Sequence, residues 1–338
     1  MGSIITLSIV QSALELGFIY SLVALALFIS FSILDIADLS TDGCFTLGCA
    51  VCAMFTIAGH PILGLFAAMF AGVCSGFVTA FLQTKMGVPS ILAGIIVNTG
   101  LYTINIMVMG FASNVNLFGV DSIFTWGKET IGGTWYKLIQ VASVVIVVAV
   151  LVGLFLNTRL GLSIRATGDN PDMVRASSIN TKMMITIGLC VANALTGLSG
   201  GLLAQYNKSC DINLGTGMVT IALASLIIGE TLMGKGSIKK RIVGVVLGSC
   251  LYRFIVAIAL RLDVPAESLK LVSAIIVAAA IAFPYLKEQM EFAKSKKASK
   301  AENQAYIREL LEQEQRSVMQ EQAVQSNGKQ YGNQEKEV

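Results

Sequence analysis

Long apolar stretches alternate with short polar ones over most of this 338-residue chain. A helix needs about 20 mostly apolar residues to cross the hydrocarbon core of a membrane. Because lipid satisfies no backbone polar group, stretches of this kind are expected to be helices. The pattern predicts an all-α, polytopic integral membrane protein with about 8–10 transmembrane helices. The apolar segments run roughly over residues 9–33, 44–58, 62–82, 88–110, 138–156, 183–204, 218–233, 242–260 and 269–283.

Charge is sparse and unevenly placed along the chain. The chain is 54% hydrophobic and 13% charged, which is about half the charge of a typical soluble domain. By the positive-inside rule, the more basic of the two alternating sets of loops faces the cytoplasm. This predicts an outside N-terminus and a cytoplasmic C-terminus, and the net charge of +3 gives no indication of nucleic acid binding. The basic residues of that set are Lys85, Arg159, Arg165, Arg175, Lys182, Lys235, Lys239, Lys240 and Arg241.

The polar C-terminal part of the chain is expected to be separate from the membrane domain. We predict a transmembrane domain over residues 1–286 and a cytoplasmic polar tail over residues 287–338. Apolar residues between Ile307 and Val318 fall roughly at helical spacing in a charged background, which is typical of a solvated amphipathic helix. The last stretch, SNGKQYGNQEKEV, has the composition of disordered chain.

No motif in the chain predicts catalysis, a metal site or a bound cofactor. Cys49 and Cys52 form a CxxC pair, but they lie in an apolar segment without a second pair, so we interpret them as small core residues. The stretch GETLMGKGS has glycines and a lysine at phosphate-loop spacing, but Gly236 stands where Ser or Thr is required as a magnesium ligand. The chain is therefore expected to carry no ATP site and to be no enzyme.

Three aspartates interrupt the first two apolar segments in the stretch LDIADLSTDG, at Asp35, Asp38 and Asp42. One interpretation is a broken helix followed by a half-helix that starts near Cys44, with capping residues at its start. The N-terminus of such a half-helix presents free N–H groups to an anion such as a carboxylate. The other interpretation is an ordinary cytoplasmic turn, and the sequence leaves the two open.

Isolated polar residues inside apolar segments are costly to bury and need an explanation. For the charges Glu15 and Arg253, pairing between helices and lining of a substrate path are equally good interpretations. For the asparagines, packing between helices is favoured. Glycines four residues apart also predict close helix packing. They are Gly72 and Gly76, Gly197 and Gly201, and Gly244 and Gly248.

A compact polar insert, IRATGDNPDMVRASSINT, lies between two long apolar stretches. Asp169 and Asn170 suit a helix N-cap, Pro171 fits the first helical position and Asp172 suits the positive end of the helix dipole. The predicted helix reaches about Ile179, which is too short and too polar to span a membrane. A helix this short is marginal in water, so it is expected to lie against a partner surface.

These stretches carry a resemblance to a known family. GLSIRATGDNPDMVRASSINT followed by GLSGGLLAQYN resembles the cytoplasmic loop and following helix of ABC-importer permeases of the branched-chain amino acid and ribose type. DIADLSTDG is similar to a stretch of the sugar-importing members. The resemblance covers roughly residues 9–283 and includes a subgroup of poorly characterised permeases, some linked to aromatic amino acid uptake.

The resemblance implies the fold and the function. The fold would be that of the vitamin B12 importer class of permease, acting as a pair that is expected to be a homodimer. Two ABC ATPase subunits would dock on the cytoplasmic loop, and an extracytoplasmic solute-binding protein would deliver a small solute outside, which is expected to be an amino acid, with an aromatic amino acid as the candidate. The ATPase coupling loop would comprise Arg165, Gly168, Asp169, Asn170, Pro171 and Arg175. The translocation pathway candidates are Glu15, Asp38, Asp42, Asn98 and Asn105.

The substrate class stays open at this point. The chain departs from the amino acid branch at residues 38–43, where a histidine-containing stretch is expected, so a sugar-importing permease is an alternative. A secondary transporter without an ATPase is a second alternative. It would need inverted repeats and a coupling-ion site near the membrane midplane, and the sequence shows no clear internal repeat.

Overall fold

The computed structural model describes residues 7–234 and 236–261 continuously, and beyond them residues 271, 274–275, 278–279, 282, 286, 289–297, 299–300, 303–304 and 306–307, all of them helical. The chain divides into two compact units between Ile281 and Ala282, and all elements named below belong to the first. The ninth expected segment, over residues 269–283, lies largely outside the described residues, as does most of the predicted amphipathic helix of the tail.

Six helices of the described part are long and apolar enough to cross a membrane. They confirm the prediction of an all-α, polytopic membrane protein. The first helix, α1 (Leu7–Leu27), continues as a short π-helix, η1 (Phe28–Ile33). The others are α3 (Pro61–Thr84), α4 (Ser90–Val108), α6 (Tyr136–Asn157), α9 (Thr181–Asn207) and α11 (Ile238–Arg261).

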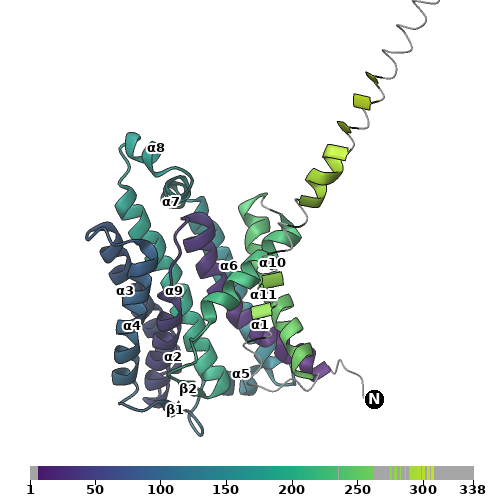
Figure 1. Ribbon diagram of the computed structural model, residues 1–338. Helices are drawn as coiled ribbons and strands as arrows, with labels where there is room; N and C mark the ends of the chain where they lie inside the picture. The colour runs from purple at the N-terminus through teal and green to yellow at the C-terminus, as the bar shows by residue number, and fades with distance from the viewer. Residues whose placement is uncertain are drawn as a thin grey trace, which may run out of the picture. The chain divides into compact units, whose positions relative to one another are not determined.

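Short elements mark the two ends of the bundle (Figure 1). At one end lie α5 (Ile123–Ile131) and a two-stranded antiparallel sheet of β1 (Asn114–Asn116) and β2 (Ser209–Asp211), in which Val115 pairs with Cys210. At the opposite end lie α7 (Arg159–Asp169) and α8 (Pro171–Ala176). We refer to these as the sheet end and the loop end.

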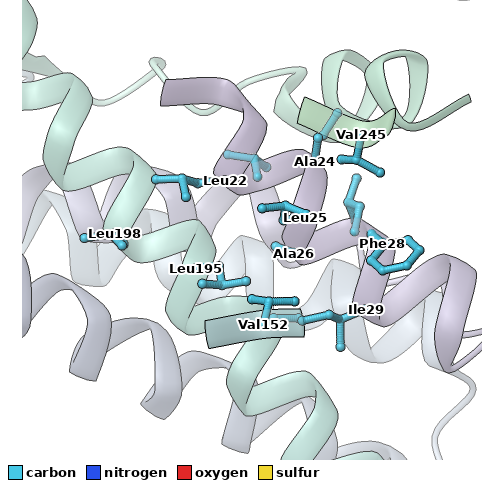
Figure 2. Close-up of a cluster of buried hydrophobic side chains, with 14 of the residues drawn as sticks. Leu22, Ala24, Leu25, Ala26, Phe28, Ile29, Val152, Leu195, Leu198 and Val245 are labelled. Carbon is cyan, nitrogen blue, oxygen red and sulfur yellow. The ribbon is translucent and has the colours of Figure 1, made fainter. Parts of the chain in front are cut away.

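The core of the bundle is built around α1 and α9, which are the most deeply buried of the long helices. Apolar side chains from both pack against residues of α6 and α11 (Figure 2). Leu25 of α1, Val152 of α6, Leu195 of α9 and Val245 of α11 are each at most 6% exposed. By contrast, α3, α4 and α6 turn apolar side chains outward, as helices in contact with lipid do.

Glycines let α9 approach its neighbours closely. A Cβ at Gly72 of α3 would lie 2.2 Å from the carbonyl oxygen of Asn193, and a Cβ at Gly48 would lie 2.2 Å from that of Gly197. Any larger side chain at these positions would force the helices apart, so the predicted packing role of the glycine pairs is confirmed on α3 and α9. Gly244 and Gly248 make the same kind of approach between α11 and α10.

Two shorter apolar helices begin inside the bundle. Residues 34–40 leave η1 as irregular chain, and Leu34, Asp38 and Ser40 within them are at most 4% exposed. The helix α2 (Thr41–Ile57) then starts at Thr41, slightly before the expected Cys44. This buried start supports the broken-helix interpretation over an ordinary surface turn. In the same way, irregular chain after β2 leads to α10 (Met218–Met233).

The two short helices run in opposite directions from a common level. Towards its C-terminal end, α2 packs with Cys210 of β2 at the sheet end. Towards its own C-terminal end, α10 places Glu230 beside Ser32 of η1 and Arg241 of α11 at the loop end. Their first turns meet where Gly217 and Val219 contact Asp42. The sequence shows no clear internal repeat that would have predicted this inverted pair. The relation between α2 and α10 is one of backbone direction and not of residue identity.

Candidate functional site

A polar cavity of about 330 Å³ lies beside the start of α2. Its wall is formed by the first turns of α2, one face of α4 and the irregular chain that follows β2. Three of the predicted pathway residues, one from α2 and two from α4, line it together. The lining residues are Asp42, Gly43, Thr46, Asn98, Thr99, Tyr102, Asn105, Ile212, Asn213 and Thr216.

Asp42 joins the two half-helices. The backbone amides of Gly217 and Val219 donate to its two carboxylate oxygens, each at 2.9 Å. The carboxylate therefore satisfies amides at the start of α10 and opposes the positive end of that helix dipole. Gly215 is close enough that a Cβ there would lie 2.0 Å from the carbonyl oxygen of Asp42. Asp42 thus serves a structural contact at the cavity wall, and its charge is already engaged.

The face of α4 that lines the cavity carries polar residues at Asn98, Tyr102 and Asn105, which are four and three residues apart. Asn105 donates from Nδ2 to the carbonyl oxygen of Gly43 at 3.1 Å. Its Oδ1 is buried and has no hydrogen-bond partner among the described residues. A Cβ at Gly43 would lie 2.6 Å from Oδ1 of Asn98, so the glycine allows α4 to pack directly against α2.

The amides at the start of α2 are also unoccupied. The backbone N–H groups of Thr41, Asp42 and Gly43 donate to no described residue. No side chain caps this helix start. Unpaired amides at a helix N-terminus, together with the helix dipole, favour an anion.

Asp38 lies outside this cavity and holds the irregular chain in place. Its carboxylate accepts hydrogen bonds from the backbone amide of Ser40 at 2.8 Å, from the Ser40 hydroxyl at 2.6 Å and from Nδ2 of Asn193 at 2.7 Å. Asp38 is 3% exposed. These contacts link the broken helix to the middle of α9.

Glu15 also lies outside the cavity, on the part of α1 nearer the sheet end. Its carboxylate accepts hydrogen bonds from Nε2 of Gln11 at 2.9 Å and from the Tyr206 hydroxyl at 2.8 Å. The alternative in which Glu15 pairs with Arg253 is wrong, because the Arg253 guanidinium instead stacks 3.7 Å from the centre of the Tyr20 ring. A partly buried ion pair elsewhere in the bundle joins Arg241 and Glu230, and the Ser32 hydroxyl is hydrogen-bonded to both side chains.

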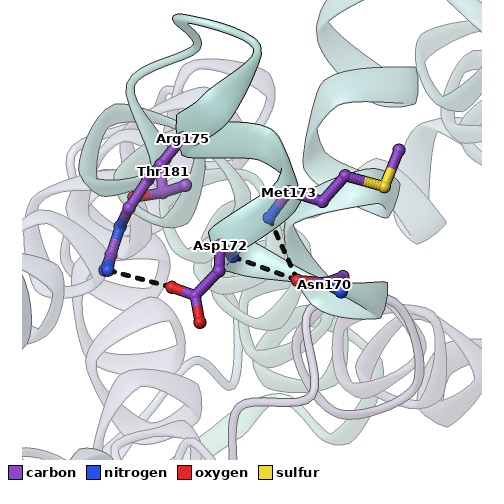
Figure 3. A network of polar contacts seen from close by, with 5 residues as sticks. All are labelled: Asn170, Asp172, Met173, Arg175 and Thr181. Atoms are coloured by element: carbon purple, nitrogen blue, oxygen red, sulfur yellow. Dashed lines mark hydrogen bonds and ion pairs between the residues drawn. The ribbon is translucent and has the colours of Figure 1, made fainter.

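The predicted coupling loop forms two short helices at the loop end. Asn170 caps α8, because its Oδ1 accepts hydrogen bonds from the backbone amides of Asp172 and Met173, each at 3.1 Å (Figure 3). Pro171 occupies the first helical position, as expected. Arg175 forms a surface ion pair with Asp172 at 3.3 Å and donates to the Thr181 hydroxyl.

Two details of this loop differ from the prediction. The helix ends at Ala176 and not near Ile179, because Ser178 takes a left-handed φ of 62° that turns the chain. Asp169 is not a cap but the last residue of α7, a helix that the sequence did not predict. Arg165 lies half-buried on α7.

Gly168 places α7 in contact with the broken helix. A Cβ at this position would lie 1.9 Å from the carbonyl oxygen of Ile33, the last residue of η1. Irregular chain follows directly and reaches α2 at Thr41. A single stretch of chain from Ile33 to Asp42 therefore connects the loop end to the cavity wall.

Sequence reasoning missed several cavity residues, among them Thr46, Tyr102, Asn213 and Thr216. Only Tyr102 had a usable signal, because it continues the helical spacing of Asn98 and Asn105 on one face of α4. Asn213 and Thr216 lie in irregular chain whose path into the bundle depends on tertiary contacts.

Comparison with known proteins identifies the family of the chain. The family model described as branched-chain amino acid transport system, permease component, matches residues 9–281. The chain belongs to this family. It is a polytopic membrane permease subunit of the ABC type for a small solute, as the sequence motifs predicted.

Individual relatives within the permease family differ in what their names say they carry. The permease is 34% identical to the tyrosine transport system permease protein of Clostridioides difficile (strain R20291) over 272 residues, which cover 80% of this chain and 90% of the relative. It is 28% identical to the ribose import permease protein RbsC of Escherichia coli (strain K12) over 233 residues, which cover 64% of this chain and 67% of the relative.

Proposed function

We propose that this permease forms the translocation pathway of an ATP-driven importer for an amino acid with an aromatic side chain. The polar cavity beside α2 carries the proposal, because it is lined both by residues of the uncapped start of α2 and by Asn105, whose Oδ1 has no hydrogen-bond partner among the described residues. The similarity to a tyrosine transport permease supports an amino acid over a sugar.

The chemistry of the cavity suits a zwitterion. The free amides at the start of α2 would receive the substrate carboxylate, since a half-helix N-terminus attracts anions. Oδ1 of Asn105, which has no partner among the described residues, would accept a hydrogen bond from the substrate ammonium. The Asp42 carboxylate is engaged by Gly217 and Val219, and Glu15 lies outside the cavity, so neither is the ammonium partner in this proposal.

The two ends of the bundle suit different partners. The basic loops and the capped helix α8 at the loop end would face the cytoplasm and receive two ABC ATPase subunits. Met173, 66% exposed near the tip of α8, offers an apolar contact for such a partner. A solute-binding protein would dock at the sheet end, outside the cell.

A second copy of the permease would face α4. This helix carries exposed polar side chains at Thr99, Tyr102 and Thr103, of which the first two also line the cavity. Lipid does not accommodate polar side chains well, so polar residues of membrane helices usually face protein or a water-filled path. A homodimer would cover this face and enclose the cavity.

The experiment is uptake into proteoliposomes that contain the permease, its ATPase and its binding protein. Radiolabelled tyrosine, tryptophan, leucine and ribose are supplied outside, with ATP inside. ATP-dependent uptake of an aromatic amino acid is expected, and uptake of ribose without any amino acid would show the substrate assignment to be wrong. Uptake that needs an ion gradient and no ATP would show a secondary transporter instead.

A further inference from the structure

The cavity contains one large apolar surface. Of its lining residues, only Tyr102 and Ile212 have large apolar side chains. Ile212 is 7% exposed, because it packs under the sheet, whereas Tyr102 is 52% exposed. The cavity therefore offers polar groups from α2 and Asn105 on one side, and the ring of Tyr102 as its main apolar contact.

The ring of Tyr102 lacks the aromatic and cation contacts that the rings of Tyr20 and Tyr206 make. Tyr20 stacks on Phe45 with ring centres 6.2 Å apart and carries Arg253 on its face. Tyr206 meets Phe124 edge to face and has Lys137 above it. Tyr102 makes no hydrogen bond, ring contact or cation contact within the described part of the chain. The half-exposed ring of Tyr102 is therefore available for contact with a solute.

We propose that Tyr102 selects the side chain of the transported solute by stacking against its aromatic ring. The inference rests on the proposed function, because it assumes that an amino acid enters the cavity. With the carboxylate at the start of α2 and the ammonium at Asn105, the side chain of the solute points along α4. Tyr102 lies one helical turn from Asn105 on the same face, and it is the ring that this side chain reaches.

The size of the effect follows from aromatic pairing. Offset or edge-to-face ring pairs are worth about 0.5–1.5 kcal/mol beyond the burial of their area. A leucine in place of Tyr102 would keep an apolar side chain, although a smaller one, and would lose the pairing. The expected loss for an aromatic solute is therefore about two- to tenfold in kcat/KM for uptake.

The test compares Tyr102→Leu and Tyr102→Phe in proteoliposomes with the ATPase and the binding protein. Both variants retain an apolar side chain, but only phenylalanine retains the ring. Phe70→Leu is the matched control, because Phe70 is an exposed aromatic residue of α3 outside the cavity. The same binding protein is present with every variant. Its selectivity therefore cancels from the ratio of variant to wild-type uptake of the same solute.

The expected result is a two- to tenfold loss of tyrosine uptake in Tyr102→Leu. Tyr102→Phe and Phe70→Leu should remain near the wild type, and leucine uptake, where the wild type shows it, should fall less than tyrosine uptake. Equal tyrosine uptake by the Leu and Phe variants would overturn the assignment of Tyr102. Absence of aromatic amino acid uptake by the wild type would instead overturn the proposed function, so the two failures are distinguishable.

Discussion

The contact between Gly168 and Ile33 predicts that Gly168→Ala weakens the link between ATP hydrolysis and transport. The new methyl group would lie 1.9 Å from the Ile33 carbonyl oxygen, whereas real Cβ contacts are essentially never under 3.0 Å. Helix α7 and the end of η1 must therefore separate by about 1 Å. Forcing extra volume into a packed contact lowers the free energy of unfolding by about 1–3 kcal/mol. The higher helix propensity of alanine offsets up to about 1 kcal/mol of that loss. The protein should still fold.

We expect a cost in function in addition to any cost in stability. Residues 34–40 lead directly from Ile33 to the cavity wall, so a looser contact at Gly168 transmits less of any movement of α7. A loss of about 1–2 kcal/mol in coupling free energy corresponds to about five- to thirtyfold. We expect the number of solute molecules transported per ATP hydrolysed to fall by that factor in proteoliposomes.

Gly100→Ala is the matched control for this variant. Gly100 lies inside helix α4, and a Cβ there would meet no atom within 4 Å. It shares the gain in helix propensity but creates no clash. If well-folded Gly168→Ala transports as many molecules per ATP as the wild type and Gly100→Ala, the contact with Ile33 does not carry the coupling.

Three further predictions concern Asp42, Glu15 and the topology of the chain in the membrane. Asp42→Asn should lower the melting temperature in nanodiscs, because charge-assisted hydrogen bonds of about 1.5–3 kcal/mol each to Gly217 and Val219 are weakened, whereas Asp172→Asn on the surface should not. Equal shifts would argue against a stabilising contact between Asp42 and the start of α10. Glu15→Gln should reduce folded yield without changing solute selectivity, and altered selectivity would place Glu15 on the pathway. A cysteine at Ser113 should react with impermeant reagent in intact cells and one at Lys297 should not, and the reverse would invert the topology.

The helices were predictable because a membrane leaves the backbone few choices. The limits of α10 matched its apolar stretch, and the break before α2 was signalled by polar and capping residues around Asp38. Helix α7 was missed because its apolar residues lie among arginines and glycines, as on a short amphipathic surface helix. Such a segment gives little signal in a search for membrane spans.

The candidate site was predictable only in part. Asp42, Asn98 and Asn105 stood out as polar residues in apolar surroundings, and the structure brings them to one cavity. Glu15 stood out for the same reason, but its partner Tyr206 is 191 residues away in the chain. Pairings at that distance depend on how helices pack, and no local pattern encodes them. Local spacing therefore identifies which side chains need a hydrogen-bond partner. Which residue that partner is depends on the tertiary structure.

The meeting of α2 and α10 at Asp42 has a mechanical consequence. Neither short helix passes the level at which both begin, so sliding one away from the other breaks no hydrogen bond inside either. Three hydrogen bonds join the two helix starts: the backbone amides of Gly217 and Val219 donate to the Asp42 carboxylate, and the backbone amide of Gly215 donates to the Thr46 hydroxyl. Parting the two helix starts beside the cavity would therefore release these three hydrogen bonds, and closing the gap would re-form the same three. The contact between the starts of α2 and α10 is thus a place where the bundle can separate without unfolding a helix.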